Sequence, residues 1–193
     1  MFGFYEPDCD CPMSSDMSDA TLGASSWNST LVPLATKYNT KLGSPSMCKQ
    51  RDEDWLTPFK NAGADWDVTS VHINVDTLWS AMMDLDYYVR KYQKPVWISE
   101  FACVNDVGGF VACTNQTHID EWLSWVVPYF QANESVVAYG PSNGEGLNTT
   151  WPLFSNGALS KTGETYLSIL KDLPTTMETY KSPSWDVVTH KQK

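Results

Sequence analysis

Short apolar runs alternate with longer stretches of helical spacing along most of this chain, and that alternation limits the folds it can adopt. The runs are rich in Val, Ile and aromatic residues, which is typical of strands. We predict strands at Phe2–Tyr5, Lys41–Ser44, Val68–Ile73, Val96–Phe101 and Val136–Gly140. Strands separated by helices form βα units, so the pattern indicates an α/β fold with a parallel sheet.

The stretches between the runs place apolar residues three or four positions apart, as an amphipathic helix does. We predict helices at Ser25–Tyr38, Glu53–Ala62, Leu78–Tyr92, His118–Gln131 and Ser160–Lys171. Two of them have a candidate N-cap: Thr117 precedes the fourth helix, and Ser160 opens the fifth.

Five βα units are too few to close an eight-stranded barrel, which takes about 200 residues or more. The chain also opens inside an apolar run, with no helix before it. We therefore expect an incomplete TIM (β/α)8 barrel, roughly strands 4 to 8 with their helices, in one partial domain over residues 1–173. Residues 174–193 are polar and lack periodicity, so we expect them to form a C-terminal tail.

The charge of the chain excludes two classes of partner. Asp and Glu number 23 against 13 Lys and Arg, which gives a formal net charge of −10. Nucleic acid and anionic membrane surfaces both require a basic patch, so we expect neither as a partner. No run approaches the ~20 apolar residues of a membrane span.

Cysteines and glycosylation sequons together indicate a secreted or cell-wall protein. The sequons stand at Asn28, Asn115, Asn133 and Asn148. No signal peptide is present, and we expect that it was lost with a missing N-terminal segment. Among five cysteines, Cys103 and Cys113 flank a Gly-Gly turn, and we predict a disulfide between them. Cys48 is a candidate partner of Cys9 or Cys11; the alternative is that all five are reduced and buried.

Two glutamates occupy the ends of predicted strands. Glu6 follows the first strand, and Glu100 closes the run Pro95-Val-Trp-Ile-Ser-Glu. The carboxyl ends of barrel strands form the rim where active sites are built, although a strand-end carboxylate can also pair with Lys or cap a helix. On strands three apart, the two would face each other across the mouth. A carboxylate pair of this kind suits glycosidic bond cleavage, in which one group protonates the leaving oxygen and the other attacks the sugar or activates water.

Several motifs resemble those of the Asl1-like glycosyl hydrolases of glycoside hydrolase family 128, a family of retaining (β/α)8 barrels. Gly3-Phe4-Tyr5-Glu6-Pro7-Asp8 is similar to its Gly-Phe-Asn-Glu-Pro-Asp motif, and Val96-Trp97-Ile98-Ser99-Glu100-Phe101-Ala102 to its Leu-Trp-Val-Thr-Glu-Phe-Ala segment. Weaker similarities occur at Ser44-Pro45-Ser46, Val71-His72, Ala138-Tyr139-Gly140 and Asn156-Gly157-Ala158-Leu159. The resemblance covers roughly residues 2–170.

The resemblance implies a function and roles for the two glutamates. Glu6 would be the acid/base on strand 4 and Glu100 the nucleophile on strand 7. The substrate would be cell-wall β-1,3-glucan, cleaved by a retaining endo-acting enzyme. Both steps are acid–base and nucleophilic chemistry, so we expect no cofactor. We expect a monomer with a polysaccharide as its partner.

Two positions depart from the family pattern. The family has Asn before the acid/base, where it bonds the sugar, whereas this chain has Tyr5, a longer side chain with one hydroxyl donor. After His72 the family commonly has an aromatic pair, and here Ile73 and Asn74 stand in its place. These departures favour one alternative to an enzyme, a cell-wall glucan-binding protein without turnover. The absence of about three barrel units leaves another, an inactive truncated fragment.

Other residues are candidates for substrate binding, each with a structural alternative. His72 could position Glu100 or a sugar hydroxyl, or be a structural donor. Trp97 could contact sugar or belong to the barrel core, and Tyr139 could approach the nucleophile or stack on a sugar. Trp151 lies in a Gly- and Asn-rich loop, which favours sugar stacking. Asp8 and Asp10 lack further ligands, so we expect no metal site and predict that Asp8 accepts from a backbone amide.

Overall fold

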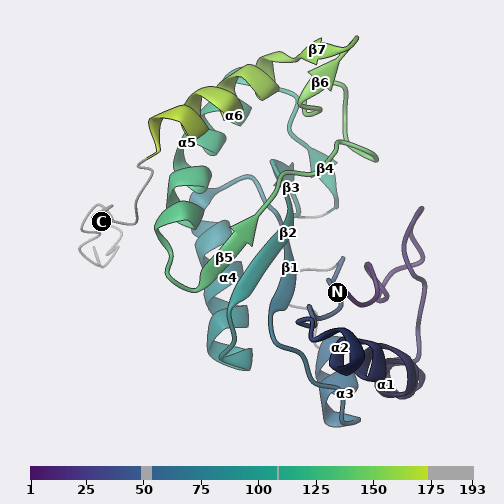
Figure 1. Cartoon of the computed structure of the whole chain (residues 1–193). Helices are drawn as coiled ribbons and strands as arrows, with labels where there is room; N and C mark the ends of the chain where they lie inside the picture. The colour runs from purple at the N-terminus through teal and green to yellow at the C-terminus, as the bar shows by residue number, and fades with distance from the viewer. Residues whose placement is uncertain (49–53, 108, 174–193) are drawn as a thin grey trace, which may run out of the picture.

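The five apolar runs lie side by side in chain order. The computed structural model describes residues 1–48, 54–107 and 109–173. Its parallel sheet has the order β1-β2-β5, from β1 (Thr69–Asn74), β2 (Val96–Ala102) and β5 (Val136–Tyr139) (Figure 1). Isolated parallel bridges join Phe2 to Gly43, Tyr5 to Ser46, and Gly43 to Val68, which extends the order to the two earlier runs. The α/β fold with parallel βα units is therefore confirmed.

The first two predicted strands are correct in position but wrong as continuous strands. Phe2–Tyr5 and Lys41–Ser44 make bridges only. Pro45 has no backbone N–H to donate and interrupts the second segment just before Ser46. Backbone bonds nevertheless pass across the two segments, with the Glu6 amide donating to the Ser46 carbonyl at 2.9 Å. The residues around Glu6 are thus held by a short ladder.

The helices flank the sheet in two groups (Figure 1). The first group is α1 (Ala20–Ser26), a π-helical stretch (Trp27–Leu31), α2 (Val32–Tyr38) and α3 (Leu56–Asn61). The second is α4 (Leu78–Tyr92), α5 (Gln116–Ala132) and α6 (Lys161–Asp172). The predicted helix at 53–62 begins at Glu53, outside the described residues. All five predicted helices have counterparts; α4 has the predicted bounds, and the others differ at their ends.

Side-chain caps explain most of those differences. Asp19 accepts from the Thr21 and Leu22 amides, so the first helix begins at Ala20 and not at Ser25. Asn115 accepts from the His118 amide and caps α5, so the prediction of Thr117 as its cap is wrong. Ser160 caps α6 by accepting from the Gly163 amide, as predicted.

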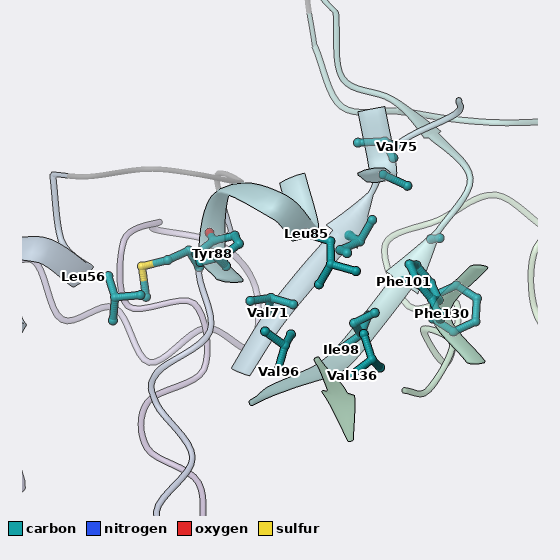
Figure 2. Close-up of a cluster of buried hydrophobic side chains, with 14 of the residues drawn as sticks. Leu56, Val71, Val75, Leu85, Tyr88, Val96, Ile98, Phe101, Phe130 and Val136 are labelled. Carbon is teal, nitrogen blue, oxygen red and sulfur yellow. The ribbon is translucent and has the colours of Figure 1, made fainter. Parts of the chain in front are cut away.

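The main core lies between the sheet and the second group of helices. Val71, Val96, Ile98, Phe101 and Val136 project from the strands toward α4 and α5, as Figure 2 shows, and each is at most 6% exposed. From the helices, Leu85, Tyr88 and Phe130 fill the same layer. Each large apolar side chain buried in this way stabilises the fold by roughly 1.5–3 kcal/mol.

Two short hairpins extend from the carboxyl ends of the strands. The first consists of β3 (Val104–Asn105) and β4 (Val111–Ala112), and the predicted Cys103–Cys113 disulfide closes it. The second consists of β6 (Phe154–Ser155) and β7 (Ala158–Leu159). The first hairpin directly follows β2, so the disulfide restrains the chain beside Glu100.

The cysteines near the N-terminus differ from expectation. Cys9 is bonded to Cys11, because the turn between them brings their Cα atoms to 5.3 Å. The Cys48 sulfur lies 3.7 Å from that of Cys11. The pairing of Cys48 with Cys9 or Cys11 is therefore wrong in this structure, although the three residues do meet. Asp8 accepts from the Cys48 amide at 2.8 Å, as predicted for a backbone partner.

Within the described residues, no helix has the length and apolar character needed to cross a bilayer. The predicted tail at residues 174–193 lies outside the described residues.

Candidate functional site

Glu6 and Glu100 meet at the carboxyl ends of the parallel segments. One carboxylate oxygen from each, together with a ring nitrogen of His72, lie within 4.8 Å of one another. Glu6 is 9% exposed and His72 is 1% exposed, whereas Glu100 is half-buried. Retaining glycosidases hold their two carboxyl groups ~5–5.5 Å apart. The separation here suits that spacing, so the expected convergence of the two glutamates is present.

A bulge in β2 turns Glu100 toward this site. Val71 pairs with Ile98, but the next residue, His72, pairs with Glu100, so Ser99 is the extra residue of β2. Strand side chains alternate between faces, and an inserted residue reverses that alternation. Without the bulge, Ser99 would lie beside His72 and Glu100 would face the helices. Hydrogen bonds from Ser70 to Ser99 and from Ser99 to the Val71 carbonyl accompany the bulge.

The backbone of Glu6 adopts a rare conformation. Its φ of +46° lies in the left-handed region, which residues other than glycine seldom occupy. Hydrogen bonds on both sides maintain it: the Glu6 amide donates to Ser46, and the Glu6 carbonyl accepts from Cys9. A disfavoured backbone conformation persists where several surrounding contacts hold it in place, often at functional sites. Here it directs the carboxylate toward His72.

His72 binds Glu6 rather than Glu100. Its Nδ1 lies 2.9 Å from Oε1 of Glu6, and the ring is almost completely buried. His72 therefore positions the predicted acid/base. The contact of His72 Nδ1 is with Glu6, and a role of His72 toward Glu100 or a sugar hydroxyl stays a prediction.

Both carboxylate oxygens of Glu100 accept a hydrogen bond. The Tyr5 hydroxyl donates to Oε2 at 2.9 Å, and the Asn74 amide donates to Oε1 at 3.1 Å. Tyr5 also packs its ring against His72, with centroids 5.1 Å apart. Tyr5 thus contacts both halves of the site, one through its hydroxyl and the other through its ring.

The environment of Tyr5 keeps its hydroxyl protonated. Burial raises the pKa of the phenol well above its usual range, and the charges of Glu100 and Glu6 raise it further. A phenol in this position donates a hydrogen bond and does not add a further negative charge beside the two carboxylates. The contact with Glu100 is therefore maintained over the pH range in which the carboxylate is charged.

Asn74 is a site residue that the sequence reasoning noted only as a missing aromatic. A signal for its role was present, since Asn74 lies two positions after His72 and strand alternation places both on one face. Ser70, two positions before His72, lies on that face too, and its hydroxyl donates to Ser99. This pattern, a polar residue at every second position of a buried strand, is the sequence signal that identifies Asn74 as a site residue.

Two aromatic residues that were candidates for stacking on a sugar do not lie at the site. Trp151 is 0% exposed, its Nε1 donates to the Ser142 carbonyl, and its ring packs against Phe101 and Trp122. Its loop folds back onto the core, so the stacking prediction is wrong. Tyr139 donates its hydroxyl to Gln131 of α5 and packs beside Phe101. It therefore lies on the helix side of the sheet, away from Glu100.

Trp97 lies between its two interpretations. It precedes the bulge on the same face as Glu100, is 38% exposed, and makes an edge-to-face contact with Phe2 at 4.7 Å. The expectation that it belongs to the core is wrong for this structure. Its contact with sugar stays a prediction.

Three groups of metal-ligating side chains come close together in the part of the chain that the structure describes. One is the Glu6, His72 and Glu100 cluster itself. The other two include Cys9 and Cys11, or Cys103 and Cys113, whose sulfurs are in disulfides and are not available as thiolate ligands. The arrangement at Glu6 and Glu100 suits acid–base and sugar-binding chemistry.

Known proteins resemble the chain in sequence and fold. A solved GH128 subgroup VII oligosaccharide-binding protein from Trichoderma gamsii is 44% identical, with a TM-score of 0.83 over 88% of this chain and 67% of that one. The corresponding oligosaccharide-binding protein from Cryptococcus neoformans is 40% identical, with a TM-score of 0.82 over 89% and 68%.

A curated relative and a family match agree with these structures. Alkali-sensitive linkage protein 1 of Schizosaccharomyces pombe is 29% identical over 87% of this chain, and the chain spans 32% of the length of that relative. The family described as "Glycosyl hydrolase catalytic core" matches residues 1–166. The chain therefore belongs to the glycosyl hydrolase catalytic core family, as one of its GH128 members.

Proposed function

We propose that this protein binds β-1,3-gluco-oligosaccharides at the Glu6–Glu100 site and does not hydrolyse them. The observation that carries the proposal is the Tyr5 hydroxyl, 2.9 Å from one oxygen of Glu100, while Asn74 engages the other. A hydrogen bond to a carboxylate oxygen draws charge from it and lowers its nucleophilicity, while the oxygen keeps a second lone pair that can accept from a sugar hydroxyl. In this site both oxygens of Glu100 are already in use as acceptors.

The relatives support the same conclusion. The two proteins that are 44% and 40% identical to the chain are oligosaccharide-binding proteins. The ligand class is supported by a GH128 endo-β-1,3-glucanase from Amycolatopsis mediterranei, which shares the fold at 17% identity and a TM-score of 0.69 and was solved with laminaripentaose. A polar, half-open site with hydroxyl, amide and carboxylate groups suits a neutral sugar rich in hydroxyls.

A retaining β-1,3-glucanase is the second candidate. The observation in its favour is that both glutamates are present, with carboxylate oxygens within 4.8 Å. In that function Glu6 would be the acid/base and Glu100 the nucleophile, as the family resemblance implies.

We also infer that the five parallel segments correspond to strands 4 to 8 of a (β/α)8 barrel. The sequons and the Cys103–Cys113 disulfide support secretion or cell-wall attachment of the protein.

Binding and hydrolysis can be measured on the same samples. Calorimetry with laminaripentaose tests binding, with cellopentaose as the β-1,4-linked control, and a reducing-end assay on laminarin tests turnover. We expect saturable binding of laminaripentaose and no new reducing ends. Glu100→Ala should weaken binding about tenfold, because it removes a charged hydrogen-bonding group. Glu121→Ala, at an exposed position of α5, is the matched control and should bind as the wild type does.

The assay separates the candidates. Reducing ends released by the wild-type protein, and abolished by Glu100→Gln, would establish the glucanase and contradict the binding proposal. Failure to bind either oligosaccharide would contradict both candidates.

A further inference from the structure

We propose that Asn115 carries an N-linked glycan in the folded protein and that Asn148, its neighbour in space, stays unmodified. The two sequons are Asn115-Gln116-Thr117 and Asn148-Thr149-Thr150. Such a modification rests on the proposed secretion of the protein, and it does not depend on sugar binding at the Glu6–Glu100 site.

N-glycosylation uses the nitrogen of the asparagine side chain and spares its oxygen. Nδ2 forms a bond to C1 of an N-acetylglucosamine, the bond between C1 and the diphosphate of a lipid-linked oligosaccharide donor breaks, and Nδ2 loses one proton. The side-chain carbonyl oxygen stays an acceptor throughout. An asparagine can therefore carry this bulky group without disturbing the fold when the fold uses only its carbonyl and its Nδ2 faces solvent.

Asn115 meets both conditions. Its Oδ1 accepts from the His118 amide at 3.3 Å and caps α5, whereas its Nδ2 donates no hydrogen bond to any residue that the structure describes. Asn115 is exposed, and Thr117, which completes the sequon, is exposed as well. A glycan on this Nδ2 therefore extends into solvent and leaves the cap of α5 in place.

Asn148 uses both ends of its side chain within the fold. Nδ2 donates to the Cys113 carbonyl at 2.6 Å, and Oδ1 accepts from the amides of Thr150 and Trp151 at 2.7 and 3.3 Å. Asn148 is half-buried, and the loop that it holds carries the completely buried Trp151. A sugar on this Nδ2 would have to fit against the backbone of Cys113, so the loop would have to leave its packed position.

The two sequons lie beside each other. Asn148 contacts Cys113, two residues before Asn115, and the Thr150 hydroxyl donates to the Thr114 carbonyl at 3.5 Å. Because both asparagines lie in one region of the molecule, a difference in modification between them reports how the fold uses each amide.

The other two sequons are intermediate. Asn28 is exposed, but its Nδ2 donates to a backbone carbonyl at 3.3 Å. Asn133 is half-buried, and its Nδ2 donates to a tyrosine hydroxyl at 3.4 Å. Each of these amides already donates a long hydrogen bond. Asn115 and Asn148 are therefore the two extremes among the four sequons, and they form the matched pair for a test.

The glycan is transferred before the chain has folded, so folding selects among the modified chains. A chain modified at Asn115 folds with the cap of α5 intact. A chain modified at Asn148 loses the packed position of its loop, and with it the hydrogen bonds to a half-buried carbonyl and two amides. We therefore expect the difference between the two sites in the folded protein.

The test produces the chain in a yeast secretory host behind an added signal peptide. The added peptide makes the result independent of whether the native protein is secreted. Thr117→Ala removes the sequon of Asn115 and keeps the asparagine that caps α5, whereas Thr117→Ser retains the sequon. Thr150→Ala is the matched control, because it removes the sequon of Asn148 and keeps the asparagine that holds the loop.

Glycan occupancy is measured on the soluble, folded fraction. Enzymatic deglycosylation in heavy-oxygen water converts each modified asparagine into labelled aspartate, which mass spectrometry of peptides detects. We expect modification of Asn115 to be at least about fivefold more frequent than modification of Asn148 in the wild-type protein. In electrophoresis, Thr117→Ala should migrate faster than the wild type by the mass of one glycan. Thr117→Ser and Thr150→Ala should migrate as the wild type does.

Two results would overturn the proposal. The first is an unmodified Asn115 in the folded protein, and the second is an Asn148 modified as often as Asn115. Should the wild-type chain not fold in this host, the total cellular chain is measured instead, and an unmodified Asn115 there overturns the assignment as well. None of these results bears on sugar binding, which calorimetry with laminaripentaose tests separately.

Discussion

The two faces of strand β2 differ in how they are built. Glu100 and Phe101 are adjacent in the chain, but Glu100 lies in a polar network with Tyr5 and Asn74, whereas Phe101 is 0% exposed among aromatic rings. The rings around it belong to Trp122, Phe130, Tyr139, Trp151 and Tyr166. The outer face, which carries Phe101, depends on many interchangeable apolar contacts. The inner face, which carries Glu100, depends on a few specific polar contacts. The two faces should therefore respond differently to substitution.

The largest expected effect is on the outer face. Phe101→Ala should lower the free energy of unfolding by about 3–5 kcal/mol, because it leaves a cavity among the surrounding rings. Glu100→Gln, one residue earlier, should change it by less than about 1 kcal/mol, since the amide keeps the size of the carboxylate and an acceptor oxygen. Urea denaturation of both variants measures the two values. Equal losses would show that the inner network stabilises the fold as strongly as the aromatic core.

Trp151 gives a smaller and more specific effect. Trp151→Phe keeps a ring in the core but removes the hydrogen bond to the Ser142 carbonyl, so we expect a loss of about 2 kcal/mol and unchanged laminaripentaose affinity. The matched control is Trp79→Phe, at a tryptophan of α4 that is 68% exposed, where the loss should be below about 0.5 kcal/mol. Weaker sugar binding without a loss of stability in Trp151→Phe would instead support the prediction that Trp151 stacks on a sugar.

The contrast between the faces also explains what the sequence could predict. Periodicity located the outer face well: α4 has the predicted bounds, and the apolar stripe of α5 is buried. Any large apolar residue at the correct spacing serves that face, so spacing alone is informative. The parallel order of the segments followed from the same alternation.

The inner face was predictable only where a motif existed. Glu6 and Glu100 were found through their motifs, but the Ser99 bulge that aligns Glu100 with His72 has no local sequence signature. The partners of each carboxylate depend on that bulge and on the backbone of Glu6, so the roles of His72 and Asn74 could not be assigned. Trp151 was misassigned because a Gly- and Asn-rich loop indicates exposure, whereas tertiary packing folded this one inward.

Asn148 tests how the loop before Trp151 is held against the outer core. Its amide donates to the Cys113 carbonyl at 2.6 Å, and its side-chain oxygen accepts from the Thr150 amide at 2.7 Å. Asn148→Ala should cost about 1–2 kcal/mol, because a half-buried carbonyl and amide lose their partner. Asn28→Ala, at an exposed sequon with a 3.3 Å bond to Gly63, should cost less than about 0.5 kcal/mol. Thermal unfolding of unglycosylated protein compares them, and equal losses would contradict a structural role specific to Asn148.

The smallest expected effect concerns a carboxylate at the opposite end of the sheet from Glu6 and Glu100. Asp67 accepts from the Leu42 amide at 2.9 Å and from Lys41 at 3.1 Å, just before the segments enter the sheet. The Leu42 amide, and secondarily Lys41, lower the pKa of Asp67 below its usual 3.8. A lowered pKa in the folded state means that the charged carboxylate stabilises the fold above about pH 4. That contribution disappears as the pH falls through the pKa of the folded state.

Asp67→Asn should therefore lower the free energy of unfolding near pH 7 by less than about 1 kcal/mol, because solvent screens the exposed side chains of Asp67 and Lys41, and the difference from the wild type should vanish toward pH 2.5. Urea denaturation between pH 2.5 and 7 measures it. Lys41→Met removes the weaker cause and keeps the Leu42 amide, so its effect should be smaller still. A difference that grew as the pH fell would reverse the sign of the linkage. It would show that the hydrogen bonds from Leu42 and Lys41 do not account for the contribution of Asp67 to stability.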